Sequence, residues 1–202
     1  MDFIAQKIYT KNGFVRENIF PGKKVLHLGC GHHKLSGAIG IDILPLGQVD
    51  ITHDLDKMPW PLLESSFDVI LAHSVVEHLS DIVALFDEIW RLAKPGARVV
   101  ITVPYFRCID SFTDITHKHF FTSSSLDYFI KENNSLSNYC YTNKNFKKIG
   151  FWHGWPQESD NFFVRSFKGW VSHHPRFFDQ YLSLLFPVKI LIWELEVGEK
   201  SI

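Results

Sequence analysis

The chain has 202 residues, of which 46% are hydrophobic and 21% are charged, and its formal net charge is -1. This length suits one domain with one substantial core. A protein that neutralises many phosphates carries a basic excess, so the charge argues against nucleic acid as a partner. The three cysteines, Cys30, Cys108 and Cys140, form no CxxC pair, which argues against a structural zinc site or a disulfide framework. A reducing, cytoplasmic compartment is the simplest interpretation.

Nothing in the sequence predicts a signal peptide or a membrane span. The N-terminal residues lack an uninterrupted apolar stretch. The longest apolar region near the C-terminus, Tyr181 to Trp193, is interrupted by Pro187 and Lys189 and is too short to cross a bilayer. We therefore expect a single domain over residues 1–202 that does not insert stably into membranes.

Apolar runs alternate with helix-like patterns in the first half of the chain, which is typical of a parallel α/β sheet. Buried strands are predicted at residues 24–28, 38–43, 49–53, 67–72 and 98–103. Between Asp81 and Lys94, apolar residues recur on one face of a helix that closes in a Lys-Pro-Gly sequence. Residues 191–197 predict a last, antiparallel strand, residues 139–153 are ambiguous, and the polar stretch 131–145 predicts an exposed loop.

The first two predicted strands end in residues that suit a ligand. The first runs into Gly29-Cys30-Gly31, and the second ends in a Gly-Ile-Asp sequence at Asp42. Glycines at a strand exit let a ligand approach the backbone closely. An acid at the end of the next strand can accept hydrogen bonds from both hydroxyls of a ribose. The alternative is that these glycines serve only a tight turn.

Five segments, taken in order, resemble the class I S-adenosylmethionine-dependent methyltransferases. They are VLHLGCG, GIDI, HDLDKMPWP, FDVILAHSVVEHL and LAKPGARVVITVPY, within roughly residues 20 to 125. The likeness is closest to a group of small-molecule and glycan methyltransferases with an LGCG first motif and an EHL segment after the fourth strand. It implies a Rossmann-like α/β fold with a seven-stranded, mostly parallel sheet and helices on both faces. It also implies S-adenosylmethionine as the cofactor.

Carried over by position, the resemblance implies a set of cofactor-binding residues: Gly29, Cys30, Gly31, Lys34, Asp42, Ile43, Asp54, Leu55 and His73. Gly29 and Gly31 would lie beneath the methionine part of the cofactor, and Asp42 would hold the ribose. Asp54 would meet the adenine amino group, with the backbone of the next residue beside it. His73 would lie near the sulfonium or the amino group. The alternatives are an Asx turn or helix cap for Asp54 and a polar strand cap for His73.

The sequence departs from the family pattern in three places. His27 stands where the family often has an acid that orients the glycine loop, and His33 stands where a third glycine is common. The connection from Gly31 to Ile41 is too short for a full helix, so we expect a turn or so there, with Lys34 free to reach the cofactor carboxylate. This short connection also argues against a nicotinamide oxidoreductase, whose GxGxxG motif opens a full helix on the pyrophosphate.

Methyl transfer from a sulfonium needs a base only when the nucleophile arrives protonated. The candidates lie just past the fifth strand, where substrate usually enters this fold: Tyr105, Asp114, His117 and His119. The run DITHKHFFT resembles a D-x-T-H segment of the same group. We expect His117, oriented by Asp114, to be the base. The alternative is that these two residues cap a helix beginning near Thr122.

The chain has eleven histidines, but HExxH and facial-triad spacings are absent, and adjacent histidines rarely bind one ion together. We therefore expect no metal.

An aromatic-rich segment at about residues 154–187 has three interpretations: an acceptor pocket or lid, packing within the domain or a homodimer, or an interfacial segment that engages lipid. The expected function is transfer of a methyl group from S-adenosylmethionine to oxygen or nitrogen of a small-molecule or glycan-type acceptor. The alternative is a non-catalytic, methyltransferase-like binding or scaffolding module, which His27 and the altered glycine loop motivate.

Overall fold

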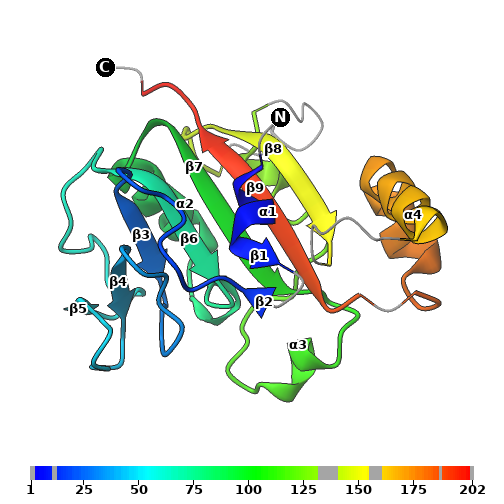
Figure 1. Cartoon of the computed structure of the whole chain (residues 1–202), viewed down its shortest axis with the longest axis horizontal. Helices are drawn as coiled ribbons and strands as arrows, with labels where there is room; N and C mark the ends of the chain where they lie inside the picture. Colours follow the sequence, from blue (N-terminus) through cyan, green and yellow to red (C-terminus); the bar gives the residue numbers. More distant parts are fainter. Residues whose placement is uncertain (1–2, 11–12, 132–140, 155–160, 187, 201–202) are drawn as a thin grey trace.

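The structure is a computed structural model that describes residues 3–10, 13–131, 141–154, 161–186 and 188–200. Its main sheet has seven strands in the order β5-β4-β3-β6-β7-β9-β8 (Figure 1). The strands are β3 Val25–Leu28, β4 Ile39–Asp42, β5 Ile51–Thr52, β6 Phe67–His73, β7 Ala93–Pro104, β8 Phe146–His153 and β9 Ile190–Val197. Neighbours from β5 to β7 pair in parallel, whereas β9 is antiparallel to both β7 and β8. This is the mostly parallel seven-stranded sheet that the sequence predicts.

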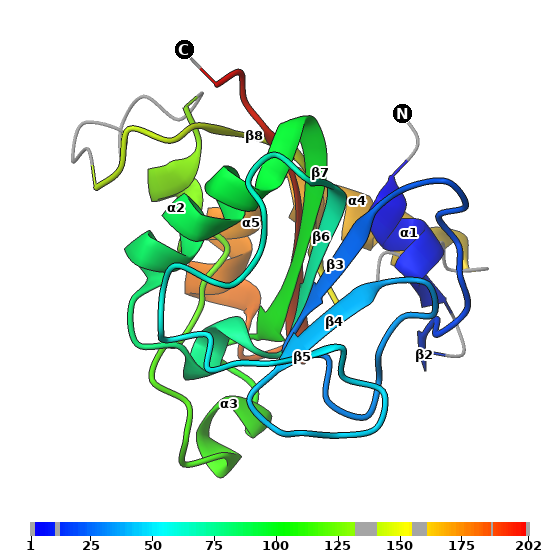
Figure 2. The ribbon, with the colours of Figure 1, turned by 90° about the vertical axis from the view of Figure 1, so that its left-hand side faces the viewer.

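The helical elements are short apart from two. They are α1 Ile4–Ile8, α2 Ile82–Leu92, α3 Asp110–Thr113, α4 Phe162–His173, α5 Pro175–Phe177, the 3-10 turns η1 Val76–His78 and η2 Asp127–Phe129, and the π-helical turn η4 Phe178–Leu182. A small hairpin of β1 Tyr9–Thr10 and β2 Gly13–Phe14 follows α1. Figure 2 shows α2 and α1 on opposite sides of the sheet, so helices cover both faces as expected.

Side chains that alternate along each strand divide the core into two parts, one on each face of the sheet. In β6, Ile70 and Ala72 belong to the large cluster that packs under α2, whereas Val69 and Leu71 belong to a smaller cluster with Ala5 and Ile8 of α1. Successive strand residues point to opposite faces, and both faces here are covered, so the parallel strands read as continuous apolar runs.

Helix α2 begins and ends close to where its pattern predicts. Asp81 caps it, because its side chain accepts a hydrogen bond from the Ala84 N–H at 2.9 Å. The helix ends at Leu92, and β7 begins at once with Ala93, before the Lys-Pro-Gly sequence. The pairing with β6 shifts between Phe67 and Val69, so this sequence forms an irregularity in β7 rather than the close of the helix.

Three further expectations can be compared with the structure. Residues 29–38, between β3 and β4, form turns without a helix, which confirms the shortened first connection. The last strand is antiparallel as predicted, and β8 occupies residues 146–153 of the ambiguous stretch 139–153. Cys30 and Cys108 are buried free thiols. Cys140 and most of the predicted loop at residues 131–145 lie outside the described residues.

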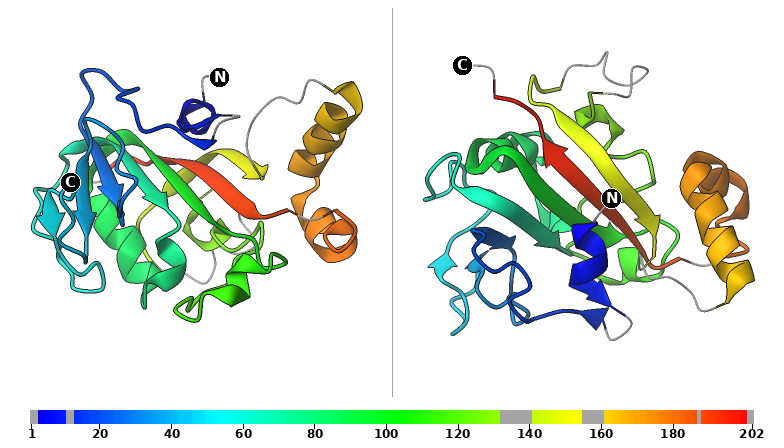
Figure 3. Two further views of the ribbon diagram at one scale, coloured as in Figure 1. Left: turned by 60° about the horizontal axis from the view of Figure 1, so that its bottom comes forward. Right: turned by 45° about the horizontal axis from the view of Figure 1, so that its top comes forward.

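Helices α4 and α5 lie beyond the β8 edge of the sheet, away from β3 to β5 (Figure 3). Val171 and Phe178 are buried, but many large apolar side chains of residues 161–186 are exposed, Phe163 at 80% and Leu184 at 76% among them. Among the described residues, no helix combines the length and the apolar character that a bilayer crossing requires.

Candidate functional site

The candidate site lies at the carboxyl ends of the parallel strands. Strand β3 is central, with β4 on one side and β6 on the other, so the chain leaves β3 and β6 in opposite directions across the sheet. Open α/β sheets bind ligands at such a switch point. The loop that follows β3 is Gly29-Cys30-Gly31, and β6 ends at His73, beside Ser74.

The two glycines of the loop are needed for different physical reasons. Both have positive φ, 56° at Gly29 and 44° at Gly31, a conformation that favours glycine. A Cβ at Gly29 would lie 2.4 Å from Cγ2 of Val75, so close packing against the loop after β6 excludes any larger residue. A Cβ at Gly31 would meet only a carboxylate oxygen of Asp42, at 4.0 Å. The backbone at Gly31 therefore faces open space that a ligand can occupy.

Asp42 connects the loop to the end of β4. Its Oδ2 accepts a hydrogen bond from the Gly31 N–H at 2.8 Å, and its Oδ1 accepts one from the Leu44 N–H at 2.9 Å. An ionised carboxylate has about four acceptor positions, so this largely buried group keeps acceptor capacity toward solvent. Ile43 beside it is 62% exposed, which leaves an apolar side chain next to the carboxylate. These features fit the ribose-binding role that the resemblance implies.

His27, at the position where the resemblance leads us to expect an acid, fixes the connection between β3 and β4. Its Nδ1 accepts the Leu35 N–H at 3.1 Å, and its side chain is buried. Burial lowers the pKa of His27 to about 3, so the imidazole is neutral. A neutral ring can accept this backbone hydrogen bond as a carboxylate would, without a buried charge.

Lys34 is not free. Its Nζ donates to Oδ2 of Asp50 at 2.7 Å, and its aliphatic chain passes over Gly40, where a Cβ would lie 2.5 Å from the Lys34 Cδ. The same Asp50 oxygen accepts the Gly40 N–H. The expectation of an unpaired Lys34 is therefore wrong, because the short connection packs the side chain against β4.

Asp54 forms the local turn that was its alternative interpretation. Its Oδ1 accepts the Asp56 N–H at 3.1 Å, and Lys57 lies 3.6 Å from its Oδ2. The side chain of Asp54 is 32% exposed, so this turn coexists with an accessible carboxylate. Leu55 is buried, and its carbonyl accepts the indole N–H of Trp60.

His73 lies in an aromatic environment that the sequence analysis missed. Its Nδ1 is hydrogen-bonded to the Tyr9 hydroxyl at 3.0 Å, and its ring stacks on Phe14 at 5.1 Å. The Tyr9 hydroxyl also contacts Oγ1 of Thr102 at 2.5 Å. Burial lowers the pKa of His73 to about 4, which keeps the ring neutral. The hairpin residues carry no local signal for this role, because only folding brings them onto β6.

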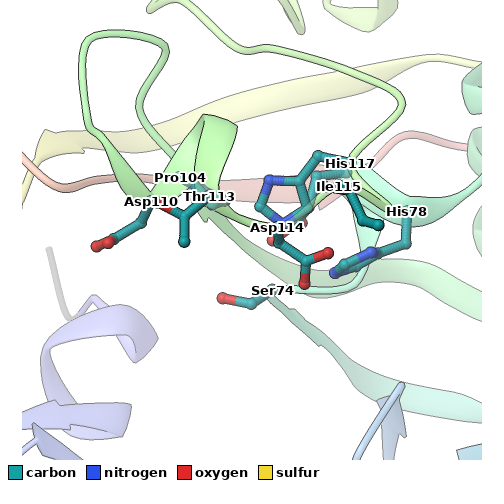
Figure 4. Close-up of a pocket in the computed structure, with 9 residues that line it drawn as sticks. Ser74, His78, Pro104, Asp110, Thr113, Asp114, Ile115 and His117 are labelled. Carbon is teal, nitrogen blue, oxygen red and sulfur yellow. The ribbon is translucent and has the colours of Figure 1, made fainter.

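An open cleft of about 640 Å³ adjoins Ser74, and Figure 4 shows its lining. The lining residues are Ser74, Glu77, His78, Pro104, Asp110, Thr113, Asp114, Ile115 and His117. Tyr105 is absent from this lining: it is fully buried, and its hydroxyl donates to Oδ1 of Asp179 at 2.7 Å. The expectation that Tyr105 acts with Asp114 and His117 is therefore wrong, because its side chain points into the core.

Asp114 and His117 both line the cleft, but each forms its hydrogen bonds with another residue. Oδ1 of Asp114 accepts both the N–H and the hydroxyl of Thr116, at 2.9 and 2.7 Å. Nδ1 of His117 donates to the Ser111 carbonyl at 2.9 Å. The Ser111 carbonyl, and not the expected Asp114, therefore fixes Nδ1 of His117. The helix-cap alternative also fails, because residues 122–126 are not helical.

Glu77 and His78 are two ionisable cleft residues to which the sequence analysis assigned no role. Glu77 is 1% exposed, neither of its carboxylate oxygens has a hydrogen-bond partner, and burial raises its pKa to about 7. The Glu77 carbonyl accepts the N–H groups of Lys118 and His119, which holds the segment after β7 against η1. The rings of His78 and His117 are therefore only 4.7 Å apart. The EHL motif was the available signal in the sequence, but His117, which lies beside it in the structure, is distant along the chain.

Comparisons with known proteins agree with this architecture. Residues 45–101, from the loop after β4 into β7, match the family model described as a methyltransferase domain. No curated protein sequence matches the chain.

Solved structures share the fold over most of the chain. An S-adenosylmethionine-dependent methyltransferase from Mesorhizobium loti has a TM-score of 0.53 and 16% identity, over 87% of this chain and 91% of its own. One from Archaeoglobus fulgidus has a TM-score of 0.52 and 18% identity, over 86% of each chain. A putative methyltransferase from Bacillus halodurans has a TM-score of 0.56 and 10% identity, over 88% and 93%. At such identities these likenesses show the fold alone, the class I methyltransferase fold.

Residues 45–101 thus match a methyltransferase domain, and most of the chain shares the fold of solved S-adenosylmethionine-dependent methyltransferases.

Proposed function

We propose that this chain transfers a methyl group from S-adenosylmethionine to an oxygen or nitrogen atom of a small-molecule or glycan-type acceptor. The observation that supports the proposal is that two different candidate binding sites lie next to each other at the carboxyl ends of the parallel strands. One is the open backbone at Gly31 beside Asp42, and the other is the cleft that begins at Ser74 and contains several ionisable side chains. A cofactor in the first and an acceptor in the second would meet near the end of β6.

The residues present fit the cofactor. Gly31 leaves room at the backbone, Asp42 retains acceptor positions for ribose hydroxyls, and the exposed Ile43 offers an apolar contact. When bound, S-adenosylmethionine supplies a methyl group on a sulfonium, and its departure leaves a neutral thioether. His73 suits a place near that sulfonium, because a neutral ring adds no repulsive positive charge. Asp54 and Leu55 remain our proposal for the adenine.

For an acceptor that arrives protonated, we propose His117 as the base. Its Nδ1–H is committed to the Ser111 carbonyl, so in the neutral ring Nε2 carries the free lone pair. Asp110 and Asp114 also line the cleft, and their carboxylates can accept hydrogen bonds from the hydroxyl or amino groups of an acceptor. Asp114 contributes by fixing Thr116, whereas the Ser111 carbonyl holds Nδ1 of His117.

The remaining expectations extend the proposal. The single domain over residues 1–202 and the lid at about residues 154–187 stay predictions, and none of the described residues 161–186 lines the cleft in this conformation. The homodimer also stays a prediction. The buried free thiols of Cys30 and Cys108 fit a reducing, cytoplasmic compartment. The net charge of -1 fits a small acceptor better than nucleic acid.

Calorimetric titration with S-adenosylmethionine and S-adenosylhomocysteine tests the cofactor site. We expect micromolar binding that weakens at least roughly 100-fold in Asp42→Ala, because two hydrogen bonds to a charged group contribute about 3 kcal/mol or more. Glu64→Ala, which removes an exposed acid far from the loop, is the matched control. Unchanged affinity in Asp42→Ala would contradict the ribose contact. Absence of binding to either ligand would favour the non-catalytic scaffold.

Turnover tests the base. Removal of a general base lowers rates by roughly 10²- to 10⁴-fold, so His117→Ala should lose turnover while cofactor binding stays intact. Near-normal turnover in this variant would refute the assignment. Formation of S-adenosylhomocysteine with any acceptor from a panel of sugars, polyols and amines would exclude the scaffold alternative.

A further inference from the structure

We propose that Glu77, His78 and His117 form a binding site for a divalent transition-metal ion in the cleft, where the ion would hold the acceptor through its oxygen. The role toward the acceptor rests on the proposed function, whereas the metal site itself does not. The site joins η1 to the segment after β7, and Figure 4 shows His78 and His117 beside Asp114 at this junction.

The first support is the donor set and its spacing. Each of the three residues offers one ligand atom, and these atoms lie within 4.8 Å of one another. Two imidazoles and one carboxylate are the ligands of catalytic zinc sites of the His₂Glu type and of non-haem iron sites. Three protein ligands leave coordination positions open, and here those positions face the cleft rather than the core.

The second support is the group behind each imidazole. Ligating histidines almost always donate their other N–H to a carbonyl, carboxylate or hydroxyl, which fixes the ring and its tautomer. Nδ1 of His117 donates to the Ser111 carbonyl at 2.9 Å. The hydroxyl proton of Thr116 goes to Asp114, so the Thr116 oxygen accepts from Nδ1 of His78 at 2.8 Å. Both rings therefore keep Nε2 as the remaining nitrogen.

The third support is the state of Glu77. A buried carboxylate normally has hydrogen-bond or ion-pair partners, because leaving it without them is costly. Among the described residues, Glu77 is the acid whose two buried oxygens both lack a hydrogen bond. Lys118, next along the chain from His117, directs its ammonium to Asp56 and Ser80 instead. A bound cation would satisfy the carboxylate that the protein leaves unpaired.

A metal at this position changes the role of His117. A hydroxyl bound to a divalent ion is more acidic than a free one, and an imidazole that ligates the ion is no longer free to accept a proton. His117→Ala removes function under either mechanism. Glu77→Gln separates the two, because it removes the charged ligand and leaves His117 in place.

Calorimetric titration of the full, chelator-treated chain with Zn²⁺ tests the site without reference to activity. We expect a single class of site in the wild-type chain and at least tenfold weaker binding in Glu77→Gln and in His117→Ala. Glu64→Gln and His173→Gln, which alter exposed side chains elsewhere, should bind as the wild type does. Glu77→Gln should fold with an unchanged or higher Tm, because an amide of the same shape replaces an unpaired carboxylate. If Glu77→Gln does not fold, His78→Gln is the alternative variant for the same titration.

Absence of saturable Zn²⁺ binding, or equal affinity in the wild type, Glu77→Gln and His117→Ala, would overturn the metal site. Titration of the same preparations with S-adenosylmethionine reports the proposed function separately. Cofactor binding without zinc binding refutes only the metal site. Zinc binding that depends on Glu77, without cofactor binding, supports the metal site and contradicts the proposed function.

Discussion

The buried His27 should make a measurable contribution to the pH dependence of the stability of this protein. The perturbation is His27→Asn, which removes an ionisable group while its Oδ1 can still accept the Leu35 N–H that Nδ1 accepts in the wild type. Phe14 packs against the same ring at 5.5 Å, so the shorter side chain also loses some contact. The informative quantity is therefore the pH dependence of unfolding and not the stability at a single pH.

The sign follows from where the proton binds. Burial first, and then the charges of His73, Lys34 and His33, lower the pKa of His27 to about 3 in the folded chain, against about 6.5 when unfolded. Between these values the unfolded chain binds a proton that the native chain does not. The stabilising contribution is thus complete above the unfolded pKa and is lost as the pH falls toward the folded one. Each such histidine changes the free energy of unfolding by about 1.4 kcal/mol per pH unit.

Urea unfolding followed by tryptophan fluorescence at a series of pH values measures this slope. Near about pH 5 the wild type should carry the contributions of both His27 and His73, and His27→Asn should reduce the slope by about 1.4 kcal/mol per pH unit. Above about pH 7.5 the two proteins should have parallel curves, which serves as the internal control. Equal slopes near pH 5 would refute the argument, because they would mean that native His27 binds a proton as the unfolded residue does.

Two further substitutions test the packing around the site. Gly29→Ala should lower the free energy of unfolding by about 2 to 4 kcal/mol in chemical denaturation, because the φ of Gly29 is 56° and a Cβ there would lie 2.4 Å from Val75. Gly96→Ala, at φ 74° with nothing within 4 Å of its Cβ, should cost only the energy of the unfavourable φ. Equal losses of stability in the two variants would exclude the clash with Val75. Asp179→Ala should cost about 3 kcal/mol, since it leaves the buried Tyr105 hydroxyl without its acceptor; a Tm within a degree or two of the wild type would show that Tyr105 finds another partner.

Local patterns in the sequence suffice for much of the fold. The apolar runs predict the strands, and the periodicity after Asp81 predicts α2, because each depends on residues only a few positions apart. The short connection after Gly31 excludes a full helix on length alone. The ribose candidate Asp42 follows from its place at a strand end, and the structure adds its hydrogen bond to Gly31.

The tertiary structure decided which side chains share the cleft. Tyr105 follows a strand end as a catalytic residue would, yet it turns inward to Asp179, because the helices after β8 supply an acceptor in the core. Lys34 is paired by Asp50 of the neighbouring turn. No spacing in the sequence predicts that Glu77 lies beside His117.

By itself, the sequence determined the strand order along the chain, the glycine loop and the acid at the end of β4, since hydrophobic period and turn chemistry are local. The folded chain was needed to show that η1 is hydrogen-bonded to the segment after β7. It was also needed to show that the Tyr9 hydroxyl is hydrogen-bonded to His73. Such contacts depend on how two surfaces pack and on which partners remain for buried polar groups, and these are properties of the whole core.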